Sequence, residues 1–476
     1  MKFTSLGFLI FFLVVYTLHW SIRGKTARLI FLFLASVGFY AAWSIPFAIH
    51  FLVVVAVSHF LNRIVLKNPD SKAFYAVLFL NLSNLFFFKY FYFLWDLLLT
   101  LSGSAFFERE TIRNVLDSSF GVDSITLPLA ISFYSFQMIA YSIDIKRRTA
   151  TEDPNFLQFA LFIFFFPQLV AGPIVRHSEF FFQLETWSAK REQLFEGFYL
   201  VFLGLLKKVV IADNLGAIID PVFHSPSSYD GVSNIFAMFG YMGRVFCDFS
   251  GYTDIARGLG KLLGIDLPEN FKAPYLSRSI GELWTRWHIT LGAWIKDYIY
   301  IPLGGSKVSE FRGNLNLLIT FTLAGFWHGA SFAFILWGFG QAMFLCIERK
   351  VLLSFPALFT KENPSYLKKF LGFVYMFIVF TLFTSLFNGK DVPSAFAMLG
   401  QSFSLGDGLR MGKLESVVYA VILTFLLNYL QLFENFPRKH WSLLKSVSFL
   451  IGFSFLVLVL LGYLAPGGAE FIYFQF

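Results

Sequence analysis

Charge is scarce in this sequence. Lys, Arg, Asp and Glu make up 14% of the 476 residues, whereas a soluble globular protein carries about 25%. So few charges cannot cover the surface of a water-soluble protein of this size. The apolar set AVILMFWYC makes up 57% of the chain, and phenylalanine alone contributes 66 residues. This composition excludes intrinsic disorder, which requires low hydrophobicity, and it favours an integral membrane protein.

Cysteine and the common catalytic motifs are also rare or absent. The two cysteines, Cys247 and Cys346, form neither a disulfide framework nor a zinc pattern. No GxSxG elbow or Walker A loop occurs, and no histidine pair has metal-ligand spacing. We therefore expect no metal and no serine nucleophile. No internal repeat is visible, which disfavours a transporter built from inverted repeats.

Long unbroken apolar runs dominate what remains. An outer-membrane barrel would show short alternating segments instead. Each helical span needs roughly 20 apolar residues, so the composition allows at most about 13 spans, and we predict about 11. The predicted fold class is an all-α polytopic membrane protein with additional re-entrant or interfacial helices. The segment Gly7–Ser21 is interpreted as a retained helix, because its positive charges mostly follow the apolar core rather than precede it.

The net charge of +8 arises from basic clusters between the apolar runs, which does not resemble the basic face of a nucleic-acid-binding protein. Positively charged loops usually stay cytoplasmic. Two apolar stretches separate each cluster from the next, so all three clusters are predicted inside and the N-terminus outside. The clusters are Arg23, Lys25 and Arg28; Arg63, Lys67 and Lys72; and Lys146, Arg147 and Arg148.

Two apolar stretches contain residues that break helices. Phe156–Val175 includes Pro167 and Pro173, and proline removes a backbone donor. Cys247–Ile265 combines glycines with four charged residues. We expect the second stretch to be either an interfacial hairpin with solvated charges or a re-entrant element that lines a cavity.

His328 is the first candidate catalytic residue. It lies near the centre of Gly313–Ile347, which contains no Asp, Glu, Lys or Arg, and an ionisable residue deep in an apolar span marks a functional site. An imidazole removed from water is neutral at pH 7 and can accept a proton. Gly325 and Gly329 would allow a close approach or a helix break beside it. The alternative is a structural histidine bonded to a carbonyl.

His288 is the second candidate. On a continuous helix over residues 281–301, Arg286 and Asp297 would lie about 16 Å apart along the axis, too far to pair. Flanking tryptophans also allow a simple aromatic belt at the membrane interface, with His288 as a polar tip. These tryptophans are Trp284, Trp287 and Trp294.

Four stretches resemble a known family. Arg286–Gly305 and Leu323–Gly338 are similar to the two signature regions of the membrane-bound O-acyltransferases, with histidines about 40 residues apart. Leu169–Leu184 and Cys247–Ile280 resemble the bacterial subgroup that contains the alginate O-acetylation membrane protein. The resemblance covers roughly residues 1–465, although after about residue 350 no pattern can be matched residue by residue.

The resemblance implies a helix bundle around a tunnel, within a single integral membrane domain over residues 1–476. We divide it into N-terminal helices (1–150), a catalytic core (151–350) and C-terminal helices (351–476). His328 matches the family's intramembrane histidine, which takes the proton from an acceptor hydroxyl as its oxygen attacks a thioester. His288 matches a second polar position, which orients or polarises one partner. Residues with expected supporting roles are Trp284, Arg286, Trp287, Asp297, Asp248, Tyr252 and Trp327.

The resemblance also implies the reactants. The donor is acetyl-CoA or another cytoplasmic acyl thioester, and no metal or cofactor is bound. The acceptor is a hydroxyl of a surface or exported polysaccharide, reached directly or through an extracytoplasmic acyltransferase partner. The expected location is the cytoplasmic membrane of a bacterium. A related branch of the family D-alanylates teichoic acids. The motifs do not identify which acyl group is transferred.

Two other functions remain open at this stage. A multipass channel or exporter could move the acyl group or the polysaccharide without chemistry, and a scaffold could hold a synthase complex together. Several basic residues could meet donor phosphates, but we expect them to be solvated residues of the cytoplasmic side. They are Lys207, Lys208, Arg257, Lys261, Lys272 and Arg278.

Overall fold

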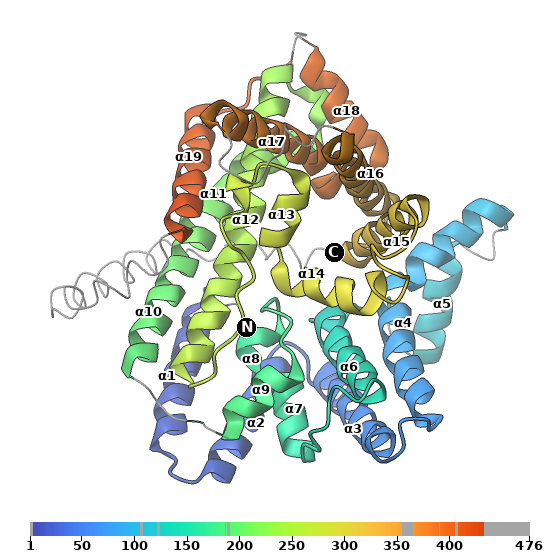
Figure 1. Cartoon of the computed structure of the whole chain (residues 1–476), viewed down its shortest axis with the longest axis vertical. Coiled ribbons are helices and arrows are strands. Elements are labelled where there is room, and N and C mark those ends of the chain that lie inside the picture. Colours follow the sequence, from blue (N-terminus) through green and yellow to red (C-terminus); the bar gives the residue numbers. More distant parts are fainter. Residues whose placement is uncertain are drawn as a thin grey trace.

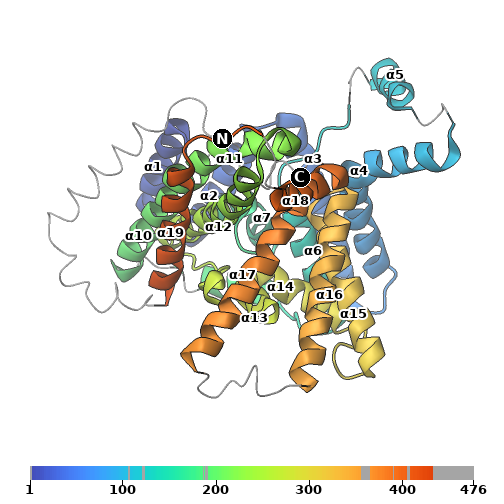
Figure 2. The same ribbon diagram turned by 90° about the horizontal axis from the view of Figure 1, so that it is seen from above.

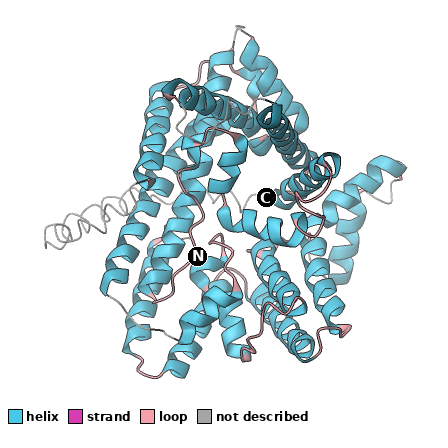
Figure 3. Cartoon of the chain, viewed as in Figure 1, coloured by secondary structure: helices cyan, strands magenta, loops and turns pink. Residues whose placement is uncertain are grey.

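The computed structural model describes residues 3–104, 108–120, 124–185, 187, 191–354, 365–389, 391–404 and 408–432. The described part of the chain forms helices and no strands (Figure 3). The predicted all-helical class is therefore confirmed for these ranges. The sequence also predicts an apolar helix near residues 446–464, and this range lies outside the described residues.

The N-terminal helices occupy the lower half of Figure 1. Serine caps begin two of them, because the side chains of Ser5 and Ser44 accept hydrogen bonds from backbone N–H groups of the first turn. The helix α5 lies apart from the other helices in Figure 2. This group consists of α1 (Leu6–Ser21), α2 (Lys25–Ala41), α3 (Ile45–Lys67), α4 (Ala73–Ser102), α5 (Arg109–Phe120) and α6 (Ile131–Lys146).

The stretch Phe156–Val175 is broken, as predicted. Its first helix ends at Phe164, a second one begins at Phe166 with Pro167 in its first turn, and residues 173–176 have no regular structure. Residues 165–175, which contain the break, are buried. The elements are α7 (Phe156–Phe164), α8 (Phe166–Leu169) and, after the irregular segment, α9 (His177–Glu185).

The prediction of a hairpin or re-entrant element over Cys247–Ile265 is wrong. Residues 247–262 belong to the continuous helix α12 (Gly231–Leu262). Its glycines serve close packing against α10 (Arg191–Leu205): a Cβ atom at Gly258 would lie 2.6 Å from the carbonyl oxygen of Gly197. Small residues allow helix backbones to approach in this way in membranes. Beside α12 lie η2 (Leu206–Ala212), α11 (Asp213–His224) and η3 (Pro226–Ser228).

The expected helix over residues 281–301 is interrupted at His288. The chain forms α13 (Ile280–Arg286), then α14 (Ile289–Ile295), which continues as the π-helix η5 (Lys296–Tyr300); η4 (Pro274–Leu276) precedes them. The reason is visible in the backbone, since His288 has a φ of 44°, which no residue adopts inside a right-handed helix. The spacing of Arg286 and Asp297 expected on a continuous helix therefore does not apply.

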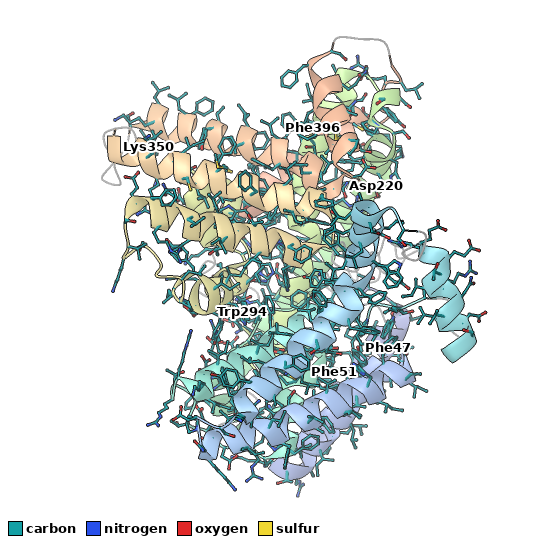
Figure 4. All side chains as sticks on the ribbon, turned by 90° about the vertical axis from the view of Figure 1, so that its right-hand side faces the viewer. Phe47, Phe51, Asp220, Trp294, Lys350 and Phe396 are labelled. Atoms are coloured by element: carbon teal, nitrogen blue, oxygen red, sulfur yellow. The ribbon has the colours of Figure 1, made fainter. Side chains whose placement is uncertain are left out.

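The C-terminal half contains α15 (Glu310–His328), α16 (Phe332–Ser354), α17 (Tyr366–Asn388), α18 (Val392–Phe403) and α19 (Leu414–Gln431). Figure 2 shows α15, α16 and α17 side by side. In Figure 1, α14 lies between this group and the N-terminal helices. Trp294, labelled in Figure 4, joins α14 to α6, because its Nε1 donates to the carbonyl of Phe136 (2.9 Å) and its ring stacks on the Phe136 ring.

Five of the described helices are long and apolar enough to cross a membrane. They are α3, α4, α17, α19 and, over Phe332–Val351, α16. The chain is thus a multi-pass membrane protein, while the predicted total of about 11 spans and the tunnel stay predictions.

Candidate active site

His328 is the last residue of α15. The next residue, Gly329, has an extended backbone, and α16 returns beside α15. This turn requires glycines, since a Cβ atom at Gly325 would lie 2.2 Å from the carbonyl oxygen of Phe334, and one at Gly329 would lie 2.3 Å from the Phe334 ring. The close approach expected from the two flanking glycines is therefore present, and it places His328 at a helix end inside the protein.

His288 lies in the break between α13 and α14 and is buried. Its left-handed backbone is strained for a residue other than glycine, and such strain marks functional sites. The Oδ1 atom of Asn270 accepts hydrogen bonds from the backbone N–H (3.2 Å) and hydroxyl (3.0 Å) of Thr290, and lies 3.2 Å from Nδ1 of His288. Because Oδ1 is an acceptor, Nδ1 of His288 carries the proton. Its other ring nitrogen, Nε2, is then an acceptor.

The two histidines line one cavity of about 370 Å³. Its walls are mainly apolar, which is typical of a small-molecule site, and come from α13, α14, η5, α15 and one residue of α16. The ring of Trp327 contacts both imidazoles, with ring centroids 6.2 Å from His288 and 5.1 Å from His328. Its lining residues Thr285, Gly292, Ala293 and Lys296 are exposed, so the cavity opens to the surface there.

Two smaller cavities also reach His328. One, of about 40 Å³, is lined on another side by Lys89 and Ser132. The other, of about 20 Å³, is lined by Tyr241 and Thr384. His328 is thus the residue that the three cavities share, whereas His288 lines only the largest.

The carbonyl groups at the end of α15 are bonded by α4. The Lys89 ammonium donates to the carbonyls of Trp327 (2.5 Å) and His328 (3.3 Å), and the Tyr90 hydroxyl donates to that of Phe326 (3.2 Å). The last carbonyls of a helix have no partner inside the helix, and within a membrane no water replaces it. Two neighbouring residues of α4 therefore permit α15 to end at His328.

The sequence profile of the membrane-bound O-acyltransferase family matches residues 146–389, a range that contains both histidines and all residues of the large cavity. The chain belongs to this family. The family predicted from the motifs is thereby confirmed.

Relatives named for three acceptors resemble this family member. A "Probable alginate O-acetylase AlgI" of Pseudomonas aeruginosa is 35% identical over 444 residues, which cover 89% of this chain and 81% of the relative. A "Peptidoglycan O-acetyltransferase" of Helicobacter pylori is 33% identical over 404 residues, or 78% of this chain and 72% of the relative. A "Teichoic acid D-alanyltransferase" of Bacillus subtilis is 28% identical over 248 residues, or 50% and 61%.

The tryptophans predicted to support the site lie around the histidines. Trp284 and Trp287 line the large cavity, and Trp327 lines the cavity that contains Lys89. Trp284 also packs edge-on against Trp337, whose ring lies 5.3 Å from that of His328. These rings form a rigid apolar wall, and their supporting roles stay predictions.

Arg286 and Asp297 do not line the described cavities. Arg286 pairs with Glu282 on α13 (2.8 Å), whereas Asp297 of η5 pairs with Arg176 at the start of α9 (2.7 Å). Arg147, from the third basic cluster, donates to the backbone carbonyl of Asp297 (3.2 Å). Asp297 therefore joins η5 to the C-terminal end of α6 and to the N-terminal end of α9.

The second and third basic clusters lie at one end of the bundle. Lys146 pairs with Asp70 in the α3–α4 loop (2.7 Å), and Arg63 pairs with Asp153 (3.3 Å). The hydrogen bond from Lys146 lowers the pKa of the Asp70 carboxyl below its usual value. These contacts agree with loops on the same side of the membrane, although the side itself stays a prediction.

Asp248 and Tyr252 lie on α12 and line none of the described cavities. Asp248 pairs with Lys208 of η2 (2.5 Å), and the Tyr252 ring stacks on that of Phe3. Six residues further along α12, Asp254 pairs with Lys207 (2.6 Å). A seam of buried ion pairs thus joins α12 to its neighbours.

The expectation of solvated basic residues is wrong for three of them. Lys207, Lys208 and Lys261 are 0%, 5% and 5% exposed, and all pair with acids. Burial of a charge is costly unless it is paired, so these lysines are held in ion pairs between the helices rather than solvated.

The sequence reasoning did not single out Lys89 and Asn270. A signal for Lys89 was available, because it is the single charged residue between Ala73 and Trp95, and a lone cation in an apolar span is a functional candidate. No such signal exists for Asn270, since its contact with His288 depends on the break between α13 and α14. Contacts of this kind, between residues far apart in the chain, cannot be predicted from local sequence patterns.

Asn270 provides the first testable prediction. We expect Asn270→Leu, which keeps the volume but removes the acceptor oxygen, to lower acyl transfer on the order of tenfold, because displacement of a positioned group by about 1 Å is costly. Transfer would be measured per amount of protein in the membrane. Asn314→Leu, a change on α15 outside the described cavities, is the matched control, and equal transfer by both variants would contradict the assignment.

Proposed function

We propose that this family member moves a small acyl group, acetyl in the first instance, from a cytoplasmic thioester to a hydroxyl of a surface or exported polysaccharide. Transfer occurs directly or through an extracytoplasmic acyltransferase partner. The observation that carries the proposal is the single cavity shared by His288 and His328 inside a family of acyltransferases. The relatives named for alginate and peptidoglycan support acetyl as the group and a polymer as the final acceptor.

The proposed reaction needs one base and one leaving group. His328 accepts the proton of the acceptor hydroxyl while the hydroxyl oxygen attacks the thioester carbonyl. The tetrahedral intermediate collapses, the C–S bond breaks, and the protonated His328 returns the proton to the leaving thiolate. One ester and one free thiol form, so no oxidant, metal or further reactant is required for balance.

His288 fits an orienting role better than a polarising one. With its Nδ1 proton bonded to Asn270, its Nε2 accepts hydrogen bonds and offers none to a carbonyl oxygen. During transfer, Nε2 of His288 therefore accepts a hydrogen bond from the acceptor hydroxyl or from the protonated His328. Of the orienting and polarising roles that the sequence left open, we therefore propose the orienting one.

The donor enters, we propose, at the end of the cavity that Lys296 lines. Lys296 is exposed there, and the backbone carbonyl of Asp297, the next residue of η5, accepts a hydrogen bond from Arg147 of the third basic cluster. Basic loops face the cytoplasm, where thioesters are made, and an ammonium group suits the phosphates of such donors. The proposed cellular location is the bacterial cytoplasmic membrane, with the N-terminus of the protein outside the cytoplasm.

The test uses inverted membrane vesicles from the producing cells, whose outer face is the cytoplasmic one. We expect radiolabelled acetyl-CoA supplied to that face to yield alkali-labile label in polymer, and only when the protein is present. If the polymer is labelled from a D-alanyl carrier protein instead, the transferred group is D-alanyl rather than acetyl. D-alanyl is the group named for the Bacillus subtilis relative. Label from neither donor, in vesicles that contain the protein, would contradict the proposal.

A further inference from the structure

Lys89 is an unusual residue for its position. It lies in the middle of α4, a predicted span, within the apolar sequence FFFKYFYFLW. Its hydrogen-bond acceptors in the described structure are the carbonyls of Trp327 and His328 and the hydroxyl of Ser132 (3.3 Å), and none is a carboxylate. A cation in an apolar span is expensive and is retained where it has a function.

The partners of Lys89 belong to the end of the helix that carries His328. A helix C-terminus bears partial negative charge, which a cation stabilises. The neighbouring Tyr90 extends this contact, because its hydroxyl bonds the carbonyl of Phe326 and its ring stacks on the Phe326 ring at 4.3 Å. Three consecutive carbonyls of α15 are thus held by two consecutive residues of α4.

The end of α15 that Lys89 holds also contacts His288. The backbone that Lys89 holds carries both the Trp327 ring, which contacts His288, and the His328 imidazole. The Lys89 ammonium lies 5.6 Å from the centroid of the Trp327 ring, and with His328 it lines the cavity of about 40 Å³. A shift of this helix end would move His328 relative to the cavity that it shares with His288.

We propose that Lys89 is a positioning residue for acyl transfer: its ammonium holds the last carbonyls of α15 and thereby fixes the imidazole of His328 beside His288. The inference rests on the proposed function. It assigns Lys89 no contact with donor or acceptor. Its substitution therefore affects the chemical step more than donor binding.

The test is the vesicle assay at varied acetyl-CoA concentration. We expect Lys89→Met to lower kcat on the order of a hundredfold while the KM for acetyl-CoA changes less than about twofold, since the cavity end at Lys296 is intact. Lys89→Arg, which still donates to carbonyls, should restore a substantial part of kcat. Lys67→Met, at the exposed end of α3, is the matched control and should behave as the wild type.

Several outcomes would overturn the inference. They are a wild-type kcat for Lys89→Met, an equal loss in Lys89→Arg and Lys89→Met, or a loss explained fully by a smaller amount of folded protein. If Lys89→Met does not accumulate, Tyr90→Phe, which keeps the stacked ring but loses one carbonyl bond, must lower kcat at unchanged KM. The His328→Gln variant separates the two proposals. If His328→Gln remains active, the proposed function fails. If His328→Gln is inactive while Lys89→Met is active, only the role of Lys89 fails.

Discussion

His328→Gln abolishes ester formation in the surface polymer while the protein remains in the membrane at its normal level. Glutamine keeps a similar size and can hydrogen bond, but it cannot accept a proton as a base. Loss of general base catalysis alone costs 10²- to 10⁴-fold, so ester content should fall below detection. The measurement is alkali-released acetyl in polymer from cells that carry the variant, relative to the amount of membrane protein.

The same experiment separates the competing functions. A passive channel or exporter should tolerate His328→Gln, so normal ester content would favour that reading. A scaffold for polymer synthesis predicts that loss of the protein removes the polymer itself rather than its esters. His224→Gln is the matched control, because His224 is an exposed histidine at the end of α11, outside the described cavities, and its ester content should equal that of the wild type.

Asp254→Asn should destabilise the protein by about 3–5 kcal/mol, the cost of leaving a buried charge without its partner. Lys207 is fully buried and its Nζ lies 2.6 Å from the Asp254 carboxylate. Loss of the negative charge therefore leaves the Lys207 ammonium between α12 and η2 without this partner. The measurement is the thermal unfolding midpoint of the purified protein, which should fall by several degrees relative to the wild type.

Two further variants show whether pairing is the cause. Asp153→Asn removes an ion pair whose side chains are about half exposed, and pairs of that kind contribute about 0–1 kcal/mol. Lys207→Met combined with Asp254→Leu removes both charges and should be less destabilising than Asp254→Asn alone. An unfolding midpoint of Asp254→Asn equal to that of Asp153→Asn would contradict the interpretation of the seam.

The fold class and the family could be predicted because they depend on composition and on local motifs. Apolar runs of span length predict membrane helices wherever they occur, and the prolines at residues 167 and 173 indicate a break in Phe156–Val175 whatever surrounds them. The two histidine motifs identify a family for the same reason. None of these features depends on which helices lie side by side.

The errors arose where neighbouring helices decide the outcome. Glycines and charges in α12 suggested a hairpin, but Gly258 faces Gly197 and Asp254 faces Lys207, so the same residues stabilise a continuous buried helix. The opposite error occurred at His288, where no glycine or proline marks the break. There the backbone of Ile289 donates to the carbonyl of Asn270 (3.0 Å), a contact between segments that local patterns do not reveal.

Chemical rescue of a His328→Gly variant tests the central claim most directly. The cavity of about 370 Å³ that reaches His328 has room for a free imidazole. If the His328 imidazole is the base, the variant should be inactive in the vesicle assay with radiolabelled acetyl-CoA, and added imidazole should restore transfer in a concentration-dependent manner. Transfer at the wild-type rate without imidazole would contradict the account.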